Sequence, residues 1–146
     1  MNFKIFPKSF YLWAIVGPTA SGKTGLSLEL ATHLKTEILS ADARQIYRHF
    51  NIGTGKASVN AQESTPHHLI NHVEPNEAYN AGRFARDAKL ALQDIFSRNQ
   101  HAVLAGGTGM FVKALCEGLN ELPEVSLDLR KSLKDKLNSE GLHSMV

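Results

Sequence analysis

The segment Gly17-Pro18-Thr19-Ala20-Ser21-Gly22-Lys23-Thr24 decides the fold that this sequence predicts, because it matches the pattern Gly-x-x-x-x-Gly-Lys-Ser/Thr in full. The run Leu12 to Val16 precedes it and ends at a glycine. This nearly all-apolar run is typical of a strand buried on both faces of a parallel sheet. Behind the segment, apolar residues recur at helical spacing and predict a helix from Lys23 to His33. A strand, a glycine-rich turn and a helix in this order are the context in which the pattern binds phosphate.

The residue types of this phosphate loop suit a di- or triphosphate ligand. Glycines let the backbone N–H groups converge on an anion, and the following helix adds its partial positive amino end. Lys23 can neutralise phosphate oxygens, and the Thr24 hydroxyl can ligate a Mg²⁺ ion that bridges them. Kinases, ATPases and transferases of diphosphate esters need the same cradle, so the loop does not name its ester. An ordinary glycine-rich turn is the simpler alternative, which the full match between strand and helix disfavours.

The rest of the chain continues to alternate short apolar runs with helical periodicity. Glu37 to Ala41 predicts a second strand, which presents Asp42 at its carboxyl edge. Ala102 to Ala105 predicts a third strand, and the glycine-rich turn Gly106 to Gly109 follows it. Further helices are predicted over roughly Ala81 to Ser97, over Met110 to Cys116, and along the leucine stripe Leu129, Leu133 and Leu137, ending near Gly141.

This alternation predicts an α/β fold of the P-loop NTPase-like class, with three α/β/α layers around a parallel sheet, in a single domain over residues 1–146. The stretch Ile52 to Pro66 is polar and contains glycine, which predicts a mobile loop that could serve as a lid. Three strands make a thin core, and the chain stops at Val146 soon after its last predicted helix. We therefore expect a fragment of a longer enzyme.

The composition fits one soluble domain and excludes several classes of protein. Of 146 residues, 42% are hydrophobic, and 16 basic against 14 acidic residues give a net charge of +2, which permits RNA binding without requiring it. Cys116 is the single cysteine, so a disulfide framework and a thiolate metal cage are both excluded. The apolar run Phe10 to Val16 ends at Gly17, far short of the ~20 residues of a membrane span. We expect a cytoplasmic protein without a membrane segment.

Further motifs past the phosphate loop resemble one family, the tRNA dimethylallyltransferases, also called tRNA isopentenyltransferases or IPP transferases. The segment Ser40 to Tyr47 resembles the family's Ser-Ala-Asp-Ser-Arg-Gln-hydrophobic-Tyr, with alanine in place of the second serine. Ile52 to Lys56 is similar to Ile-Gly-Thr-Ala-Lys, and Pro66 to Asn71 is similar to Pro-His-His-Leu-Ile-Asp. The turn Gly106 to Gly109 matches the family's second glycine turn. The resemblance covers nearly all of this chain but about the first half of a typical family member.

The resemblance implies transfer of a dimethylallyl group from dimethylallyl diphosphate to N6 of adenosine 37 in tRNA, with release of diphosphate. The exocyclic amine is a weak nucleophile, so a carboxylate that takes its proton would assist the attack. Asp42 is the candidate general base; its alternatives are an N-cap of a helix near Arg44 or a Mg²⁺ ligand. Thr108 is the second candidate catalytic residue, orienting the leaving oxygen or the amine. Its alternative is a hydroxyl that caps the next helix.

The family also implies contacts with the anticodon stem-loop of tRNA. They fall on Asp42, Ala43, Arg44, Gln45 and Arg130, of which the two arginines can bind phosphate or stack on a base. A lone surface arginine is usually only a solvated charge, and Ala43 lacks the hydroxyl that serine would contribute. We expect Mg²⁺ as the cofactor and a monomer as the working form, with little activity from this chain alone.

Other readings of the sequence remain open. A P-loop kinase of a small metabolite or nucleotide would bind ATP in the same loop, and an inactive phosphate-binding fragment would have no activity. An isopentenyltransferase acting on free adenine nucleotides is a closer relative, but the histidine pair and Gly-Thr-Gly-Lys favour the tRNA enzyme. His67, His68, His72 and Glu74 suggest zinc, yet adjacent histidines point in different directions and no cysteine helps. We expect them to form structural hydrogen bonds near the active site instead.

Overall fold

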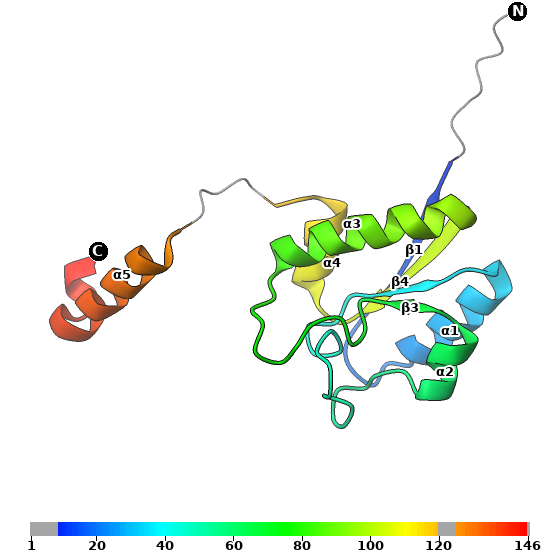
Figure 1. The fold of residues 1–146 in the computed structure, drawn as a ribbon, viewed down its shortest axis with the longest axis horizontal. Helices are drawn as coiled ribbons and strands as arrows, with labels where there is room; N and C mark the ends of the chain where they lie inside the picture. Colours follow the sequence, from blue (N-terminus) through cyan, green and yellow to red (C-terminus); the bar gives the residue numbers. More distant parts are fainter. Residues whose placement is uncertain (1–8, 120–124, 146) are drawn as a thin grey trace, which may run out of the picture.

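The computed structural model describes residues 9–119 and 125–145 (Figure 1). Strands alternate with helices along the chain, as the sequence predicts. The elements are β1 (Tyr11–Val16), α1 (Lys23–Leu34), β2 (Ile38–Ser40), α2 (Val59–Ser64), β3 (His67–His68), α3 (Ala81–Arg98), β4 (His101–Gly106), α4 (Gly109–Cys116), α5 (Leu127–Glu140) and the 3₁₀ helix η1 (Leu142–Met145).

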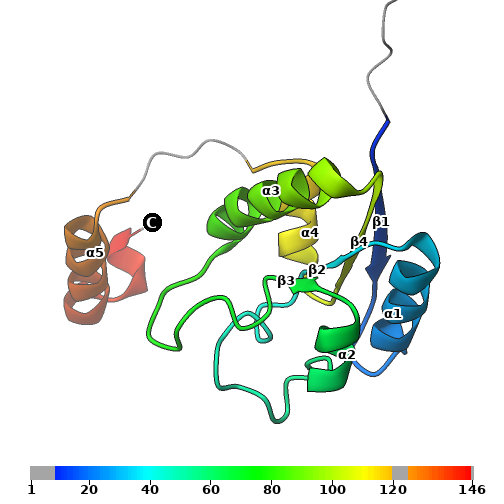
Figure 2. The same cartoon turned by 45° about the vertical axis from the view of Figure 1, so that its right-hand side comes forward.

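The strands form one four-stranded sheet in the order β1-β4-β2-β3, and every pair is parallel. Its two faces carry separate cores. Leu39 and Leu104 pack against Phe84 of α3, whereas Ile38 and Val103 belong to the cluster with Ala31 of α1. Figure 2 shows α1 on one side of the sheet and α3 and α4 on the other. The predicted three-layer α/β/α fold with a parallel sheet is confirmed.

One expectation about β1 is wrong. Its apolar sequence predicts burial on both faces, but Tyr11, Trp13 and Val16 are 47%, 45% and 55% exposed. The sheet order explains the difference, because β4 is the only strand that pairs with β1 among residues 9–119 and 125–145. Composition predicts that a segment is a strand, but the neighbours that bury it come from the rest of the fold.

A second expectation, that Ile52 to Pro66 is loop throughout, is also wrong. Residues Val59–Ser64 form the short helix α2, which begins where the Ser58 hydroxyl accepts a hydrogen bond from the Ala61 N–H at 3.3 Å. Just after this stretch, His67–His68 form a fourth strand, β3, beside β2. Both elements are too short for hydrophobic periodicity to reveal them.

The last predicted helix is present as α5, and it ends at Gly141, whose φ is +77°. Its leucines Leu129, Leu133 and Leu137 are exposed. In both views α5 and η1 lie apart from the sheet and the helices that cover it (Figures 1 and 2). Within the described residues, every helix is too short or too polar to span a lipid bilayer.

Candidate active site

A cavity of about 420 Å³ opens at the carboxyl edge of the sheet. Segments that are distant in the sequence meet around it, as expected where parallel strands end together. They are the phosphate loop and α1 (residues 19–24 and Ser27), β2 and its following turn (Ile38, Ser40, Asp42, Gln45), residues Thr54, Gly55 and Ala57, the segment with His67 and Ile70, and the end of β4 (Ala105, Gly106).

The phosphate loop has the shape that the sequence predicts. Ala20 and Gly22 have φ of +65° and +83°, so the chain curls tightly before α1 begins at Lys23. No side chain caps the amino end of α1 and no acidic residue lies in its first turn, so its first N–H groups remain available to an anion. The Lys23 ammonium donates to the Pro18 carbonyl oxygen and thus lies across its own loop. Gly17 and Pro18 connect the loop to β1 and do not line the cavity.

Asp42 lines the same cavity as the phosphate loop. Its Oδ1 accepts hydrogen bonds from the backbone N–H groups of Arg44 at 2.8 Å and Gln45 at 3.2 Å. Asp42 therefore holds a turn at residues 43–46, and because no helix begins near Arg44 in the described part of the chain, the helix-capping alternative is wrong. Both of these hydrogen bonds end on Oδ1, and Asp42 also lines the cavity, so holding the turn and acting in catalysis are compatible in this geometry.

Thr108 contacts the turn that carries Asp42. Its backbone N–H donates to the Ala41 carbonyl at 3.1 Å, and its hydroxyl oxygen accepts from the Ala43 N–H at 2.9 Å. The hydroxyl does not cap α4, so that alternative is wrong. Two turns that lie 65 residues apart in the sequence are thereby joined. Gly106 permits the close approach, since a Cβ there would lie 2.2 Å from the Ala41 carbonyl oxygen.

Residues 54–57, here called the roof loop, are fixed by two side chains whose contacts the sequence did not reveal. The Gln45 amide nitrogen donates to the carbonyl oxygens of Thr54 at 3.3 Å and Gly55 at 3.1 Å. The Lys56 ammonium donates to the Tyr47 carbonyl at 2.6 Å and to the side-chain oxygens of Asn71 and Asn51 at 2.7 and 3.2 Å. Burial lowers the pKa of Lys56.

Gln45 and Lys56 each lie in a segment that resembles a family motif. Their partners are mostly main-chain oxygens about ten residues away, which a linear pattern does not show. The Gln45 side chain is predicted to contact tRNA, but in this structure its amide nitrogen donates hydrogen bonds to the roof loop.

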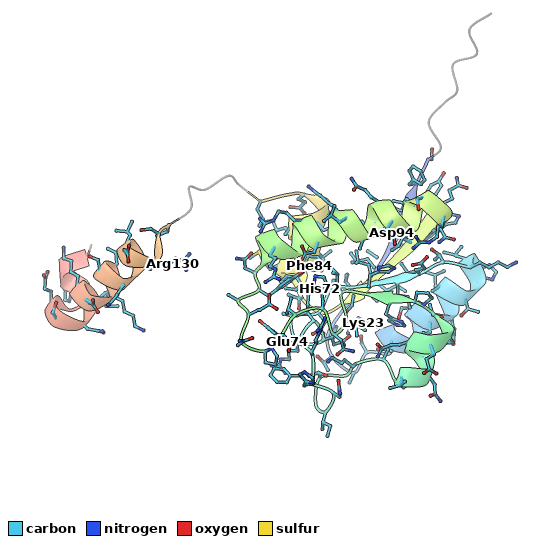
Figure 3. The ribbon with its side chains drawn as sticks, in the orientation of Figure 1. Lys23, His72, Glu74, Phe84, Asp94 and Arg130 are labelled. Atoms are coloured by element: carbon cyan, nitrogen blue, oxygen red, sulfur yellow. The ribbon has the colours of Figure 1, made fainter. Side chains whose placement is uncertain are left out.

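The other predicted tRNA-contacting residues separate into two groups. Ala43 and Arg44 are exposed beside Asp42, on the turn after β2. Arg130 lies on α5, and Figure 3 shows it well apart from Lys23 and the helices around the sheet. Ala43 and Arg44 thus lie in the chain between Asp42 and Gln45, which line the cavity, whereas Arg130 does not line it.

The histidines make the structural hydrogen bonds that we expected. His67 Nδ1 lies 2.6 Å from the Thr65 carbonyl oxygen, His68 Nε2 lies 2.6 Å from Oε2 of Glu37, and His72 Nε2 lies 3.2 Å from Oδ2 of Asp87. His67 also lines the cavity, which agrees with the expected place of these histidines near the active site. Oxygen donors of the kind that Mg²⁺ takes, Thr24 and Asp42, line the same cavity, so its donor set suits this ion.

Comparisons with known proteins decide the family. A family model described as IPP transferase matches residues 45–146. The chain belongs to the IPP transferase family. The family resemblance drawn from the motifs is therefore confirmed. The tRNA dimethylallyltransferase of Nitrosospira multiformis is 44% identical over 144 residues, so the alignment includes the phosphate loop that precedes the family match.

Solved IPP transferase structures share this fold. The full-length tRNA isopentenylpyrophosphate transferase of Bacillus halodurans has a TM-score of 0.73 at 36% identity, over 94% of this chain and 45% of that chain. A eukaryotic dimethylallyltransferase acting on tRNA has a TM-score of 0.75 at 31% identity, over 90% of this chain and 33% of that chain. The chain spans 44% of the length of the Nitrosospira relative.

Proposed function

We propose that this chain is the donor-binding and catalytic core of a tRNA dimethylallyltransferase. The enzyme would transfer a dimethylallyl group from dimethylallyl diphosphate to N6 of adenosine 37 in tRNA and release diphosphate. The names of the relatives support this activity. The observation that carries it is that Asp42 and the phosphate loop line one cavity. A tRNA substrate also favours a cytoplasmic location.

The phosphate loop would bind the diphosphate of the donor. The N–H groups at the amino end of α1 and the Lys23 ammonium supply positive charge where the leaving group gains negative charge. Magnesium, when bound, would be held by the Thr24 hydroxyl and would neutralise part of the charge on the departing diphosphate. Lys23 must leave the Pro18 carbonyl to reach the ligand, which a flexible four-carbon side chain allows.

In the transfer step the adenine N6 lone pair attacks the first carbon of the dimethylallyl group. The bond from that carbon to the diphosphate oxygen breaks, and its electron pair leaves with the diphosphate. The proton lost from N6 passes to the Asp42 carboxylate, whose Oδ1 already holds the turn through Arg44 and Gln45. Thr108 holds the turn that carries Asp42, because its hydroxyl oxygen accepts a hydrogen bond from the Ala43 N–H. The hydroxyl hydrogen of Thr108 can then orient the amine or the leaving oxygen.

The turn after β2 would meet the acceptor. Ala43 and Arg44 are exposed beside Asp42, where a flipped-out adenosine must approach the carboxylate. Arg44 can pair with an RNA phosphate or stack on a base. Ala43 offers only its backbone, whose N–H is already bonded to Thr108. Arg130 would contribute through α5 rather than at the cavity.

A chimera tests the proposal, because this chain spans less than half of its relatives. The matched segment of the Nitrosospira enzyme is replaced by residues 1–146, and transfer of labelled dimethylallyl to tRNA is measured under single-turnover conditions. We expect transfer by the chimera and little or none by the 146-residue chain alone. The chimera could instead fold, fail to use dimethylallyl diphosphate and pass the γ-phosphate of ATP to a small acceptor. That result would establish the alternative hypothesis, a P-loop kinase.

A further inference from the structure

Lys56 carries a positive charge beside the candidate active site but does not line its cavity. It lines a second cavity of about 560 Å³ instead, together with Asn51 and Asn71. Its ammonium donates to the Tyr47 carbonyl at 2.6 Å and to the side-chain oxygens of Asn71 and Asn51 at 2.7 and 3.2 Å. An ammonium has three N–H donors, so these oxygens satisfy it completely. Lys56 therefore holds parts of the chain together rather than offering its charge to a phosphate.

The Tyr47 carbonyl belongs to the stretch of residues 42–47 after β2, here called the Asp42 turn. The last three carbonyl oxygens of this turn accept hydrogen bonds from other segments: Gln45 from the Asn71 N–H at 3.2 Å, Ile46 from the His72 N–H at 2.7 Å and Tyr47 from Lys56. Near the start of the turn, the Ala43 N–H donates to the Thr108 hydroxyl oxygen at 2.9 Å. The Asp42 turn is thus held at its start by Thr108 and at its end by Lys56 and the segment after β3.

Lys56 also joins the Asp42 turn to two other segments that line the cavity. Its own backbone belongs to the roof loop, whose neighbouring residues Gly55 and Ala57 both line the cavity. Asn71 directly follows Ile70, which lines the cavity from the segment after β3. The hydrogen bonds of one ammonium therefore fix the Asp42 turn, the roof loop and the segment after β3 relative to one another.

We propose that Lys56 is a positioning residue for the transfer reaction, because its ammonium holds the Asp42 turn and so sets where Asp42 lies in the cavity. This role rests on the proposed function, in which Asp42 takes the proton of the acceptor amine. A general base must lie within hydrogen-bonding reach of that proton, and a displacement of about 1 Å can slow a reaction about 100-fold. The acceptors of Lys56 lie outside the phosphate loop, so the affinity for the donor should depend on Lys56 much less than the rate does.

Lys56→Met in the chimera with the Nitrosospira enzyme separates positioning from simple stabilisation. Methionine keeps an unbranched side chain and removes the ammonium. In single-turnover transfer the amplitude counts the competent enzyme, whereas the rate constant reports the geometry within it. At saturating dimethylallyl diphosphate and tRNA we expect the rate constant to fall about 10- to 100-fold, while the affinity for dimethylallyl diphosphate changes by less than about twofold.

Lys89→Met is the matched control, because it makes the same substitution at an exposed position on α3 outside the cavity. It should leave the amplitude, the rate constant and the affinity unchanged. A lower amplitude with an unchanged rate constant for Lys56→Met would mean that Lys56 serves stability alone, and would overturn the positioning role. A chimera that transfers nothing before either substitution would instead remove the proposed function itself.

Asn71→Asp tests the same contact in the opposite direction and does not depend on the folding of Lys56→Met. Asn71 has a φ of +51°, which aspartate also tolerates, and its side-chain oxygen lies 2.7 Å from the ammonium. A carboxylate there would pair with the ammonium more strongly than the amide does. In the 146-residue chain, hydrogen exchange of the His72 and Val73 amides, which donate to Ile46, should slow at least about threefold.

The slower exchange should disappear when Lys56→Met is added to Asn71→Asp, because the ammonium that pairs with the carboxylate is then absent. Unchanged exchange in Asn71→Asp, or slower exchange that persists without the ammonium, would show that Lys56 does not hold the Asp42 turn and would overturn the proposal.

Discussion

Gly106 shows how a single residue couples the fold to the candidate active site. Its position would bring a Cβ to 2.2 Å from the Ala41 carbonyl oxygen and to 2.9 Å from the Ala41 Cα, both backbone atoms that have no room to yield. The sequence predicts a glycine turn here, but its reason lies 65 residues away in the chain. Close approach of β4 to the turn after β2 is what lets Thr108 bond to Ala41 and Ala43.

Gly106→Ala should therefore lower the free energy of unfolding by about 1–3 kcal/mol, because the backbone must shift to admit the methyl group. Urea denaturation followed by circular dichroism measures the change. Gly109→Ala is the matched control, since nothing lies within 4 Å of its added Cβ and the residue opens α4. The control should be as stable as the wild type or slightly more stable. Equal stability of the two variants would refute the close approach.

At the scale of elements, the sequence predicts long periodic segments well and short ones poorly. The predicted helix at Ala81 to Ser97 is α3, and the predicted strand at Ala102 to Ala105 is β4, each within about one residue. The two-residue strand β3 and the six-residue polar helix α2 carry too little pattern to be detected. In the site, the phosphate loop and the Asp42 and Thr108 turns were predicted. The contacts that hold the roof loop were not, because they depend on main-chain oxygens and asparagine side chains that folding brings close.

Glu37 joins three of these elements at the amino end of β2. Its carboxylate lies 2.6 Å from His68 Nε2 on β3 and accepts from the Arg98 guanidinium at 3.0 Å at the end of α3. Burial alone would raise the pKa of Glu37, but the hydrogen bonds from His68 and Arg98 outweigh it and lower the pKa below the ordinary 4.5. The unfolded chain therefore takes up a proton more readily than the folded one.

The contribution of Glu37 to stability should thus be complete above about pH 4.5 and should be lost as pH falls through the lower pKa of the folded state. Glu37→Gln should destabilise the protein by about 1–3 kcal/mol at pH 7, with a smaller difference from wild type at pH 3. Urea denaturation across this range checks the sign. Glu140→Gln, at an exposed position on α5, should show neither effect. A penalty for Glu37→Gln that grows on acidification would contradict this account.

At the scale of the whole molecule, burial is unequal across the sheet. The central strands β4 and β2 are covered on both faces, whereas β1 lies at an edge with three large exposed side chains. The Tyr11 N–H donates to the Gln100 carbonyl at 3.0 Å, and successive N–H groups of a strand point to opposite edges. Trp13 and Ile15 therefore also face β4, whereas Leu12 and Ala14 direct their N–H groups to the open edge.

Hydrogen exchange read by NMR should show this alternation along β1. Amides of Trp13 and Ile15 should exchange at least about tenfold more slowly than those of Leu12 and Ala14, because β4 protects one set alone. The contrast should not depend on protein concentration. Equal protection of both sets would mean that another strand covers the open edge in solution.

The central claim is that the Asp42 carboxylate takes the proton from the acceptor amine beside a bound diphosphate. Asp42→Asn in the chimera with the Nitrosospira enzyme tests it most directly. Asparagine keeps an Oδ1 that can accept from Arg44 and Gln45, so the turn is preserved and only the base is lost. Single-turnover transfer should fall by about 10²–10⁴-fold, while dimethylallyl diphosphate affinity changes by less than about twofold. Transfer at the unmodified rate would contradict the account.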